Sequence, residues 1–379
     1  MWAVLSALDG GDATWFCFHY PMKELRSILA RLRAPAVFPA ALATLARVRG
    51  SSYRRPGARL LLAANGGRTG AISGGCLEDD VLLRAKAVAA SGVAQTVTYD
   101  TTAENDLVWG VGLGCHGVVD VVIEPLASEG GAGWTEIVRK AFVAPTDAAV
   151  AIGFADGSLG TRAALAAGVG KSFWGDETLR KGLQEALTQR SSHYEEADGQ
   201  RVFYEYLPMP VPLLIFGAGD DAQPLCQMAA ELGFVVKVID PRPTYATKER
   251  FPAADTVTVA KPDELAKWVA VPGRTAAVVM THHYVHDVPF LRWLLPQPVA
   301  YLGLLGPRQR AEKILGDLAA GGLAVTAEMR ARLHAPVGLD VGATTPESVA
   351  LAVLAEIQAV LAGRDGRPLR ERGGPIHGE

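Results

Sequence analysis

The chain has 379 residues, of which 49% are hydrophobic and 20% are charged, and its formal net charge is −3. This length exceeds that of a usual single domain and supplies enough apolar material for two cores. A nearly balanced charge provides no broad positive field, so we expect no nucleic acid as the main partner. The start of the chain lacks a basic leader, and no apolar run approaches the roughly 20 residues that span a bilayer. We therefore expect a cytoplasmic protein without a membrane span.

The four cysteines, Cys17, Cys76, Cys115 and Cys226, are widely spaced and include no C-x-x-C pair. Such spacing does not build a disulfide framework, and it favours the reduced thiols of the cytosol. Cys17 and Cys226 are interpreted as inert, since most free cysteines pack in a core.

Helical and strand patterns are mixed in the first half of the chain. Apolar residues recur at helical spacing over 22–32 and over 77–88. Strands are predicted at 41–49, 58–64, 69–73, 95–99, 118–123, 148–154 and 201–207. The stretch 175–200 is polar and charged, and no helix or strand is predicted there. We expect a mixed α+β domain at residues 22–208, ending among Pro208, Pro210 and Pro212.

Strands and helices alternate in the second half, which is the rhythm of a parallel sheet with right-handed crossovers. Strands are predicted at 213–216, 234–239, 256–260, 276–281 and 299–304, and helices at 223–232, 263–269, 288–294 and 308–318. A last helix has Thr345 as its N-cap and Pro346 at its first position, and it ends at Gly363. We expect a Rossmann-type doubly wound domain at residues 209–379 with strand order 3-2-1-4-5, so the chain is α/β in class.

A glycine turn, Gly217-Ala218-Gly219, follows the first of these strands, and Asp240 closes the second. Glycines let a ligand phosphate approach backbone N–H groups, and an acid at this position accepts hydrogen bonds from ribose hydroxyls. The pattern therefore indicates NAD(P) or another phosphate-bearing ligand. Asp220 and Asp221 oppose an ordinary dinucleotide, because carboxylates repel a pyrophosphate unless a metal or an arginine intervenes. The alternative is a turn that uses small residues for packing alone.

Two segments of the first domain carry candidate reactive or anion-binding groups. Arg54, Arg55 and Arg59 place three guanidiniums around a turn, which favours an anionic ligand, although ion pairs with nearby acids explain them equally. Cys76 follows Gly74-Gly75 at a helix start, where the dipole favours the thiolate that ligates metals and attacks sulfur. Cys115 lies in a second glycine-rich loop and is the other candidate.

Histidines and arginines follow two later strands of the predicted sheet. His282 and His286 have the spacing of a metal pair, whereas the plainer interpretation is a helix capped by Asp287 beside exposed histidines. Arg308 and Arg310 follow the fifth strand and are expected at the same edge of the sheet.

Taken in order, these motifs resemble the XdhC/CoxI family, whose members are accessory proteins of molybdenum hydroxylases such as xanthine dehydrogenase. The resemblance runs from about residue 22 to 378. The matching segments are Arg49-Gly50-Ser51-Ser52, Arg54-Arg55-Pro56-Gly57-Ala58-Arg59, Ser73-Gly74-Gly75-Cys76-Leu77-Glu78, Gly112-Leu113-Gly114-Cys115, Phe216-Gly217-Ala218-Gly219, Asp240-Pro241-Arg242-Pro243, Arg250-Phe251-Pro252, Tyr301-Leu302-Gly303-Leu304-Leu305-Gly306 and His334-Ala335-Pro336-Val337-Gly338-Leu339-Asp340. Asp220 stands where members often have His, and Pro307 and Gln309 interrupt another family run.

The resemblance implies that the protein binds molybdenum cofactor (molybdopterin), a phosphorylated pterin dithiolene, and shields it while a terminal oxo ligand is exchanged for sulfur. It implies two partners, a cysteine desulfurase and the molybdenum hydroxylase apo-enzyme that receives the cofactor, and we expect a homodimer. Cys76, and after it Cys115, are the candidates for handling sulfur, with Cys76 also the candidate molybdenum ligand. The expected cofactor contacts are Arg54, Arg55, Arg59, Gly74, Gly75, Gly217, Gly219, Asp240, Arg242 and Arg308.

Such a protein is a binding and insertion factor rather than a turnover enzyme. Two alternatives stay open at this point. The glycine turn and Asp240 favour an NAD(P)-dependent oxidoreductase, and a protein scaffold that docks the desulfurase on the hydroxylase needs no contact with the cofactor.

Overall fold

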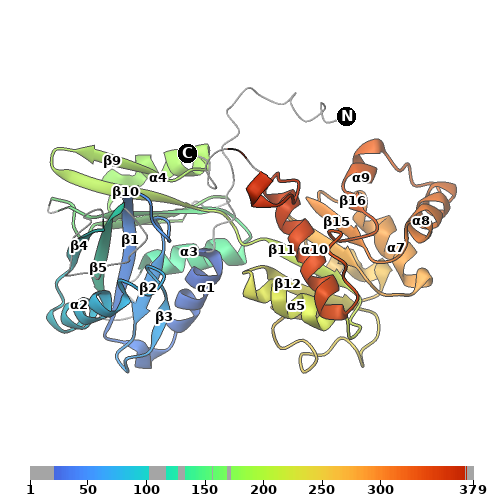
Figure 1. Ribbon diagram of the computed structural model, residues 1–379, viewed down its shortest axis with the longest axis horizontal. Helices are drawn as coiled ribbons and strands as arrows, with labels where there is room; N and C mark the ends of the chain where they lie inside the picture. The colour runs from blue at the N-terminus through green and yellow to red at the C-terminus, as the bar shows by residue number, and fades with distance from the viewer. Residues whose placement is uncertain are drawn as a thin grey trace. The chain divides into compact units, whose positions relative to one another are not determined.

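The computed structural model describes residues 21–101, 117–126, 133–155, 157–168, 172–371 and 373. The chain divides into two units, and the division falls between Pro210 and Val211 (Figure 1). Among the residues described, no helix is long and apolar enough to cross a membrane.

The first unit contains two antiparallel five-stranded sheets. One has the order β3-β2-β1-β5-β4 and the other the order β8-β7-β6-β10-β9. The strands are β1 (Ala40–Gly50), β2 (Arg59–Leu62), β3 (Arg68–Gly70), β4 (Gln95–Asp100), β5 (Gly117–Leu126), β6 (Ala148–Gly153), β7 (Arg162–Ala166), β8 (Phe173–Gly175), β9 (His193–Ala197) and β10 (Gln200–Leu207). The helices are α1 (Pro21–Arg31), α2 (Glu78–Ser91), α3 (Gly133–Val143) and α4 (Arg180–Gln189), with short 3₁₀ turns at Pro35–Val37 and Glu177–Leu179.

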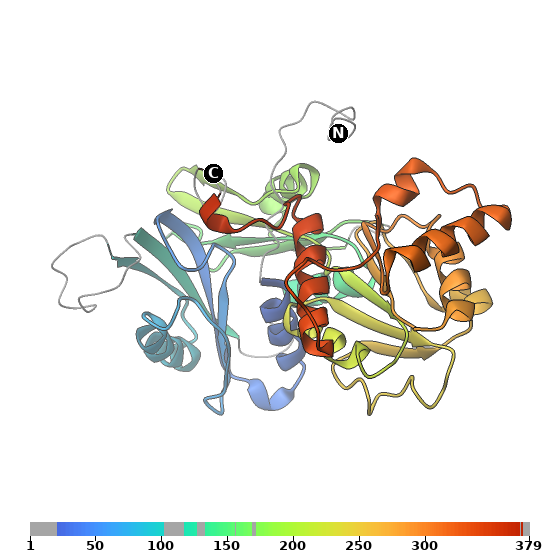
Figure 2. The same ribbon diagram turned by 45° about the vertical axis from the view of Figure 1, so that its right-hand side comes forward.

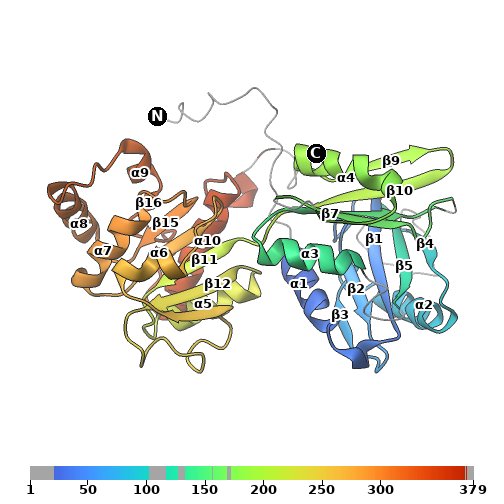
Figure 3. The ribbon, with the colours of Figure 1, turned by 180° about the vertical axis from the view of Figure 1, so that it is seen from behind.

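Strand alternation in β1 explains how the first unit is layered. Ala41, Ala43 and Leu45 belong to the core beneath α2, whereas Leu42 and Ala46 on the other face pack toward α1, α3 and the second sheet. The outer face of the second sheet is covered by α4 (Figure 3). Each sheet therefore has a helix on its outer face and shares its inner face with the other sheet.

Charged side chains are buried between the two sheets. Arg59 of β2 is 1% exposed and donates from both terminal nitrogens to the Glu205 carboxylate of β10, and its Nη1 also donates to the Gly57 carbonyl at 2.7 Å. Arg162 of β7 donates from Nε and Nη2 to the Glu124 carboxylate of β5. The indole of Trp134, on α3, lies 5.6 Å from the first guanidinium and 4.9 Å from the second. Charge pairing and cation–π contact thus add to the hydrophobic packing in this layer.

The second unit is a six-stranded parallel sheet with the order β13-β12-β11-β14-β15-β16. Its strands are β11 (Pro212–Phe216), β12 (Val235–Asp240), β13 (Thr256–Val259), β14 (Ala276–Val279), β15 (Tyr301–Leu304) and β16 (Leu333–His334). The predicted Rossmann-type architecture and the order 3-2-1-4-5 of its first five strands are confirmed. The two-residue strand β16 was not predicted, because it is too short to show periodicity.

Helices cover both faces of this sheet. They are α5 (Ala222–Glu231), α6 (Leu265–Trp268), α7 (Tyr284–Leu294), α8 (Arg308–Ala320), α9 (Ala327–Ala331) and α10 (Pro346–Leu361), with 3₁₀ turns at Pro262–Glu264 and Leu369–Glu371. The helices α5 and α10 share one core with the sheet (Figure 2), and α6, α7 and α8 share the core on the other face. Thr345 caps α10 as predicted, since its side chain accepts from the Ser348 N–H.

The sequence did not reveal several elements of the first unit. The region 175–200, for which no element was predicted, contains α4 and β9, and α3, β7 and β8 were also missed. In α4 only Leu183 and Ala186 are buried apolar residues, and Gly182 takes the third inward position because a side chain there would overlap the Tyr204 ring. A glycine in a helical stripe conceals the apolar period, so the pattern appears polar.

The buried pair of Arg59 and Glu205 gives a testable expectation for stability. Arg59→Ala leaves the Glu205 carboxylate buried without its cation, so the free energy of unfolding should fall by about 3–5 kcal/mol. Urea denaturation followed by tryptophan fluorescence measures this loss, since Trp134 contacts the guanidinium. Arg55→Ala is the matched control; Arg55 is exposed, so this change should alter stability by about 0.5 kcal/mol or less. An equal loss in both variants would contradict the role given to the pair.

Candidate functional site

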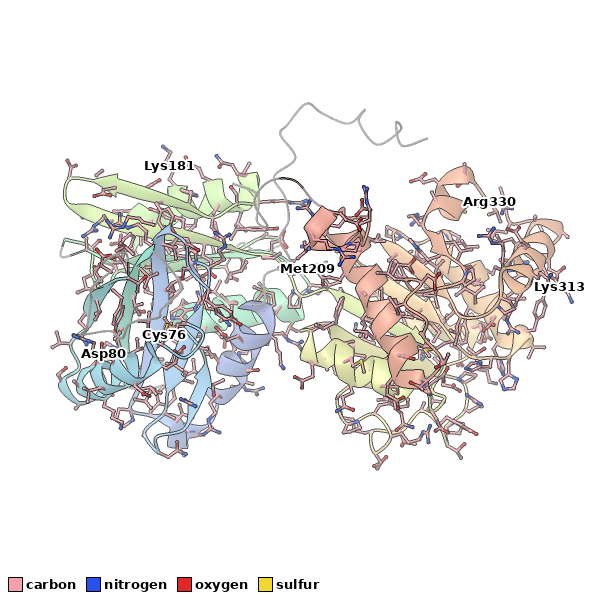
Figure 4. All side chains as sticks on the ribbon, viewed as in Figure 1. Cys76, Asp80, Lys181, Met209, Lys313 and Arg330 are labelled. Carbon is pink, nitrogen blue, oxygen red and sulfur yellow. The ribbon has the colours of Figure 1, made fainter. Side chains whose placement is uncertain are left out.

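Cys76 is exposed at the end of a loop that leads into α2 (Figure 4). The predicted strand at 69–73 ends earlier, at Gly70, because the next residues turn away to form this loop. The Ser73 hydroxyl accepts hydrogen bonds from the N–H groups of Gly75 and Leu77, each at 3.1 Å. Gly75 has φ +116°, a left-handed conformation that favours glycine. The thiol is thus exposed on a loop with a defined backbone.

Glu78 holds the other side of this loop. Its carboxylate accepts from the Ile72 N–H at 3.2 Å, from the Ser73 N–H at 2.7 Å and from the Ser73 hydroxyl. Burial by itself raises the pKa of Glu78, but these hydrogen bonds outweigh burial, and the net pKa lies below its usual value. An ionised, buried Glu78 therefore fixes the backbone that precedes Cys76. The sequence placed this acid only as a partner of the helix dipole.

The loop between β1 and β2 (residues 51–58), which we call the arginine loop, lies beside the loop between β3 and α2 (residues 71–77), which we call the Cys76 loop. A side-chain carbon built on Gly74 would lie 3.5 Å from the ring of Tyr53, and Tyr53 itself is 72% exposed. The loop is anchored to α1, where Glu24 accepts from Arg54 Nη2 at 2.5 Å and from the Arg59 N–H at 2.8 Å. Two sequence segments predicted to carry chemistry are therefore neighbours in the first unit.

The three arginines of this segment, two in the loop and one at the start of β2, have different environments. Arg59 is engaged in the buried pair with Glu205, and Arg54 is paired with Glu24. Arg55 is exposed, and no carboxylate in the described part of the chain pairs with it. The geometry thus leaves Arg55 as the guanidinium that is available to an anion, and it gives the other two to the ion pairs that the sequence allowed as the alternative.

The remaining cysteines differ from Cys76. Cys115 and Cys17 lie outside the described residues. Cys226, on α5, is 1% exposed, and burial raises the pKa of its thiol to about 11. At neutral pH this thiol is protonated and enclosed, as expected of an inert core cysteine.

Asp240 closes the glycine turn of the second unit rather than facing solvent. The carboxylate is fully buried and accepts from the Ala218 N–H at 2.7 Å, the Arg242 N–H at 2.8 Å, and the Nε and Nη2 of Arg242 at 2.9 and 2.8 Å. Burial alone raises the pKa of Asp240, but these bonds lower the net pKa below its usual value. A carboxylate has about four acceptor positions, and here protein groups occupy four. Ribose hydroxyls therefore find no free acceptor on Asp240.

The space above the glycine turn is occupied as well. Gly217 has φ +114°, and a side chain on it would approach the Met280 carbonyl oxygen to 2.7 Å, so glycine is needed for the close approach of β11 and β14. A side-chain carbon on Gly219 would lie 2.7 Å from Asp221 Oδ1, so a carboxylate lies beside the glycine turn, where it would repel a ligand phosphate.

The two aspartates after the turn each have a partner. Asp221 Oδ2 lies 2.6 Å from the Nε2 of His282, which has φ +61°, and Asp220 Oδ1 accepts from Arg250 Nη2 at 2.8 Å. Arg250 thus supplies the compensating cation that the sequence required, and its partner is the aspartate itself. The strand order reverses between β11 and β14, which is where doubly wound folds commonly bind a ligand. Here the two aspartates at that position pair with side chains of the protein itself.

The metal pair predicted at His282 and His286 does not form. His282 pairs with Asp221, whereas the His286 ring lies edge-on to His283 at 5.9 Å. The alternative prediction, capping by Asp287, is wrong. Asp287 is buried within α7 and accepts from the Thr281 hydroxyl at 2.5 Å and from the Arg310 guanidinium. Arg308, unlike Arg310, is exposed at the first position of α8.

A second polar network holds the segment 334–340. Glu356 of α10 accepts from the Tyr301 hydroxyl at 2.5 Å and from the Gly338 N–H at 2.8 Å, and it lies 3.1 Å from His334 Nδ1. The His334 ring stacks on Tyr301 with a centroid separation of 4.4 Å. Burial raises the pKa of Glu356, but the hydrogen bonds prevail and the net pKa is lowered. Glu356 was not identified from the sequence, because its partners Tyr301 and His334 lie 55 and 22 residues away in the chain.

Comparison with known proteins places these motifs in a family. Residues 36–100 match the model of the XdhC and CoxI family, and residues 213–357 match the model of the XdhC Rossmann domain. A protein of Bacillus subtilis named as a probable xanthine dehydrogenase subunit is 33% identical over 334 residues, which are 84% of this chain and 92% of the relative. The chain belongs to the XdhC and CoxI family.

Two further proteins are similar to this chain, one over part of its length and one over most of it. The "Uncharacterized protein YqeB" of Escherichia coli is 37% identical over 159 residues, which are 42% of this chain and 29% of that protein. A crystal structure described as a xanthine dehydrogenase from Bacillus halodurans has a TM-score of 0.73 and 28% identity, and the match covers 92% of this chain and 99% of the other. The family match over residues 36–100 contains both the arginine loop and the Cys76 loop.

The exposure of Cys76 and the enclosure of Cys226 predict the order of thiol labelling. In a Cys17→Ser, Cys115→Ser background, one thiol should react rapidly with an aromatic disulfide reagent at neutral pH, and the second should react only after unfolding. Adding Cys76→Ser should abolish the rapid phase. Cys226→Ser is the control and should preserve it. Rapid labelling that survives Cys76→Ser would mean that the loop does not present its thiol as described.

Proposed function

We propose that this XdhC-family chain binds molybdenum cofactor as its cargo and supports the maturation of a molybdenum hydroxylase of the xanthine dehydrogenase type. The names of two relatives, both concerned with xanthine dehydrogenase, support the target class. The observation that carries the proposal is the exposed Cys76 thiol on a loop that Glu78 braces and that contacts the exposed Tyr53, two residues before the exposed Arg55.

Each exposed group of this cluster suits one part of a phosphorylated pterin dithiolene. A thiolate is a soft ligand of the kind that molybdenum and sulfur chemistry requires, which is the role proposed for Cys76. The Arg55 guanidinium offers forked donors for the phosphate, and the exposed face of Tyr53 offers a surface on which a planar pterin stacks. Gly74 and Gly75 leave the backbone between these groups uncovered.

The acids of α2 decide where the phosphate binds. A helix N-terminus is ordinarily a good anion site. Here Glu78, Asp79 and Asp80 occupy the first turn of α2, and their carboxylates repel a phosphate at close range. The proposal therefore assigns the phosphate to Arg55 and the molybdenum end of the cargo to Cys76.

The second unit supports a binding role better than a dehydrogenase role. The acceptor positions of Asp240 are filled and the Asp221 carboxylate lies beside Gly219, and both observations disfavour NAD(P). Arg242 is likewise engaged by Asp240. Arg308 is exposed at the start of α8, and it is the remaining candidate of this unit for an anion.

The partners in this proposal are a cysteine desulfurase, which delivers sulfur while the cargo is bound, and the apo-hydroxylase that receives the cofactor. In this scheme Cys76 holds the molybdenum end of the cargo in place until the apo-hydroxylase receives it. A homodimer is part of the same expectation, and sedimentation of the purified chain measures it.

The molybdenum and pterin content of purified protein tests the proposal. Protein made in a host that synthesises the cofactor should retain both, Cys76→Ala should lose most of its molybdenum, and Arg55→Ala should retain at least tenfold less pterin, since a charge-assisted contact contributes about 1.5–3 kcal/mol. Cys226→Ala is the control and should match the wild type. The same variants should impair activation of the target hydroxylase in cells.

Two outcomes would overturn this function. Wild-type protein that carries neither molybdenum nor pterin, together with normal hydroxylase activation by Cys76→Ala, favours the scaffold. Tight binding of NADH, measured by quenching of tryptophan fluorescence, favours the oxidoreductase.

A further inference from the structure

Three side chains that favour metals meet on the outer side of the second sheet of the first unit. Glu185 comes from α4, and His193 and Glu195 come from β9, and one ligand atom of each lies within 4.8 Å of the other two. Residues two apart in a strand share a face, so β9 presents His193 and Glu195 together. Glu196 belongs to the opposite face, where it lies 3.5 Å from Arg47.

Neighbouring residues hold this cluster in place. The Tyr204 ring of β10 stacks on the His193 ring with centroids 4.9 Å apart and planes 15° apart. The Tyr204 hydroxyl donates to Glu195 Oε2 at 3.1 Å, which leaves Oε1 on the side of His193. Gly182 of α4 lies directly against the Tyr204 ring, so the helix approaches closely and brings Glu185 to the same place one turn later.

His193 has an unexplained feature. Both ring nitrogens are buried, and neither has a hydrogen-bond partner among the described residues. Glu195 Oε1 is a nearby acceptor, but it is 3.9 Å from Nε2, which is too far for a hydrogen bond. The side chain as a whole is 24% exposed, but two shielded nitrogens without partners are unfavourable, because each has lost water without a replacement. A cation between the Glu185 and Glu195 carboxylates would accept the lone pair of a His193 nitrogen and so supply the missing partner.

We propose that Glu185, His193 and Glu195 form a binding site for a divalent transition-metal cation, with Zn²⁺ as the ion that the donor set favours. Zinc binds imidazole nitrogen and carboxylate oxygen, and three protein ligands completed by water give the four-coordinate site that it prefers. Mg²⁺ and Ca²⁺ take oxygen ligands and are disfavoured by the imidazole. The two carboxylates neutralise the cation, and the hydrogen bond from Tyr204 orients one of them as metal sites require.

Lys181 is the cation that competes with a metal here. Its Nζ lies 3.7 Å from Glu185 Oε1, but the side chain is 88% exposed and gains little from this pair. Metal binding would displace it into solvent. The bound ion would tie α4 to β9, which is an edge strand of its sheet. Such a tie stabilises a strand that is otherwise held on one side only.

Zinc titration of the full-length apo-protein tests the site, with a fluorescent chelator as the competitor. A background of Cys17→Ser, Cys76→Ser and Cys115→Ser removes every thiol except that of the buried Cys226. The parent should bind one Zn²⁺ at this site, and His193→Ala and Glu185→Gln should each weaken that binding at least tenfold. Glu196→Gln, on the other face of β9, is the matched control and should bind as the parent does. Glu185 lies at the surface, so its variant remains informative if His193→Ala fails to fold.

Thermal unfolding gives an independent readout. Zn²⁺ at about a hundredfold excess over Kd should raise the Tm of the parent by roughly 5 °C, whereas Mg²⁺ should not. Glu185→Gln should lose this shift. Equal zinc affinity in the parent, His193→Ala and Glu185→Gln would overturn the proposal, and so would a parent that binds no zinc.

Discussion

The buried pair between Arg59 and Glu205 is the contact on which the geometry of the first unit depends. It joins the two sheets, and through the Gly57 carbonyl it closes the turn that ends the arginine loop. A side chain at Gly57 would overlap the Glu205 carboxylate, so the pair and the turn require each other. Because that loop lies against Gly74, a contact far from any exposed thiol helps to define the surroundings of Cys76.

The second unit uses charge in the same way. Asp240 is buried and accepts four hydrogen bonds, and these bonds hold the glycine turn and the Arg242 segment together. In a dinucleotide-binding protein an acid at this position keeps free acceptors for a ribose. Here the same residue type in the same motif stabilises the fold, so the motif identifies the architecture and the hydrogen bonds decide the role.

The sequence predicted what depends on periodicity and failed where one residue's partner decides its role. Alternating elements from residue 213 onward predicted a parallel Rossmann-type sheet, because each strand and helix shows its own period, and the strand order followed from that type of fold. The α4 helix escaped notice because Gly182 interrupts its apolar stripe. Nothing in the sequence distinguished Arg55 from Arg59. Arg55 is exposed, whereas Arg59 is 1% exposed because it pairs with Glu205, which lies 146 residues away in the chain. No local pattern contains such a distant partner.

The central claim is that a braced loop presents the Cys76 thiol to the molybdenum of a bound cofactor. X-ray absorption at the molybdenum edge tests this claim directly, on protein loaded with cofactor. The account predicts one more sulfur neighbour of molybdenum in the wild type than in Cys76→Ser, with the dithiolene sulfurs unchanged. The same number of sulfur neighbours in both proteins would contradict it.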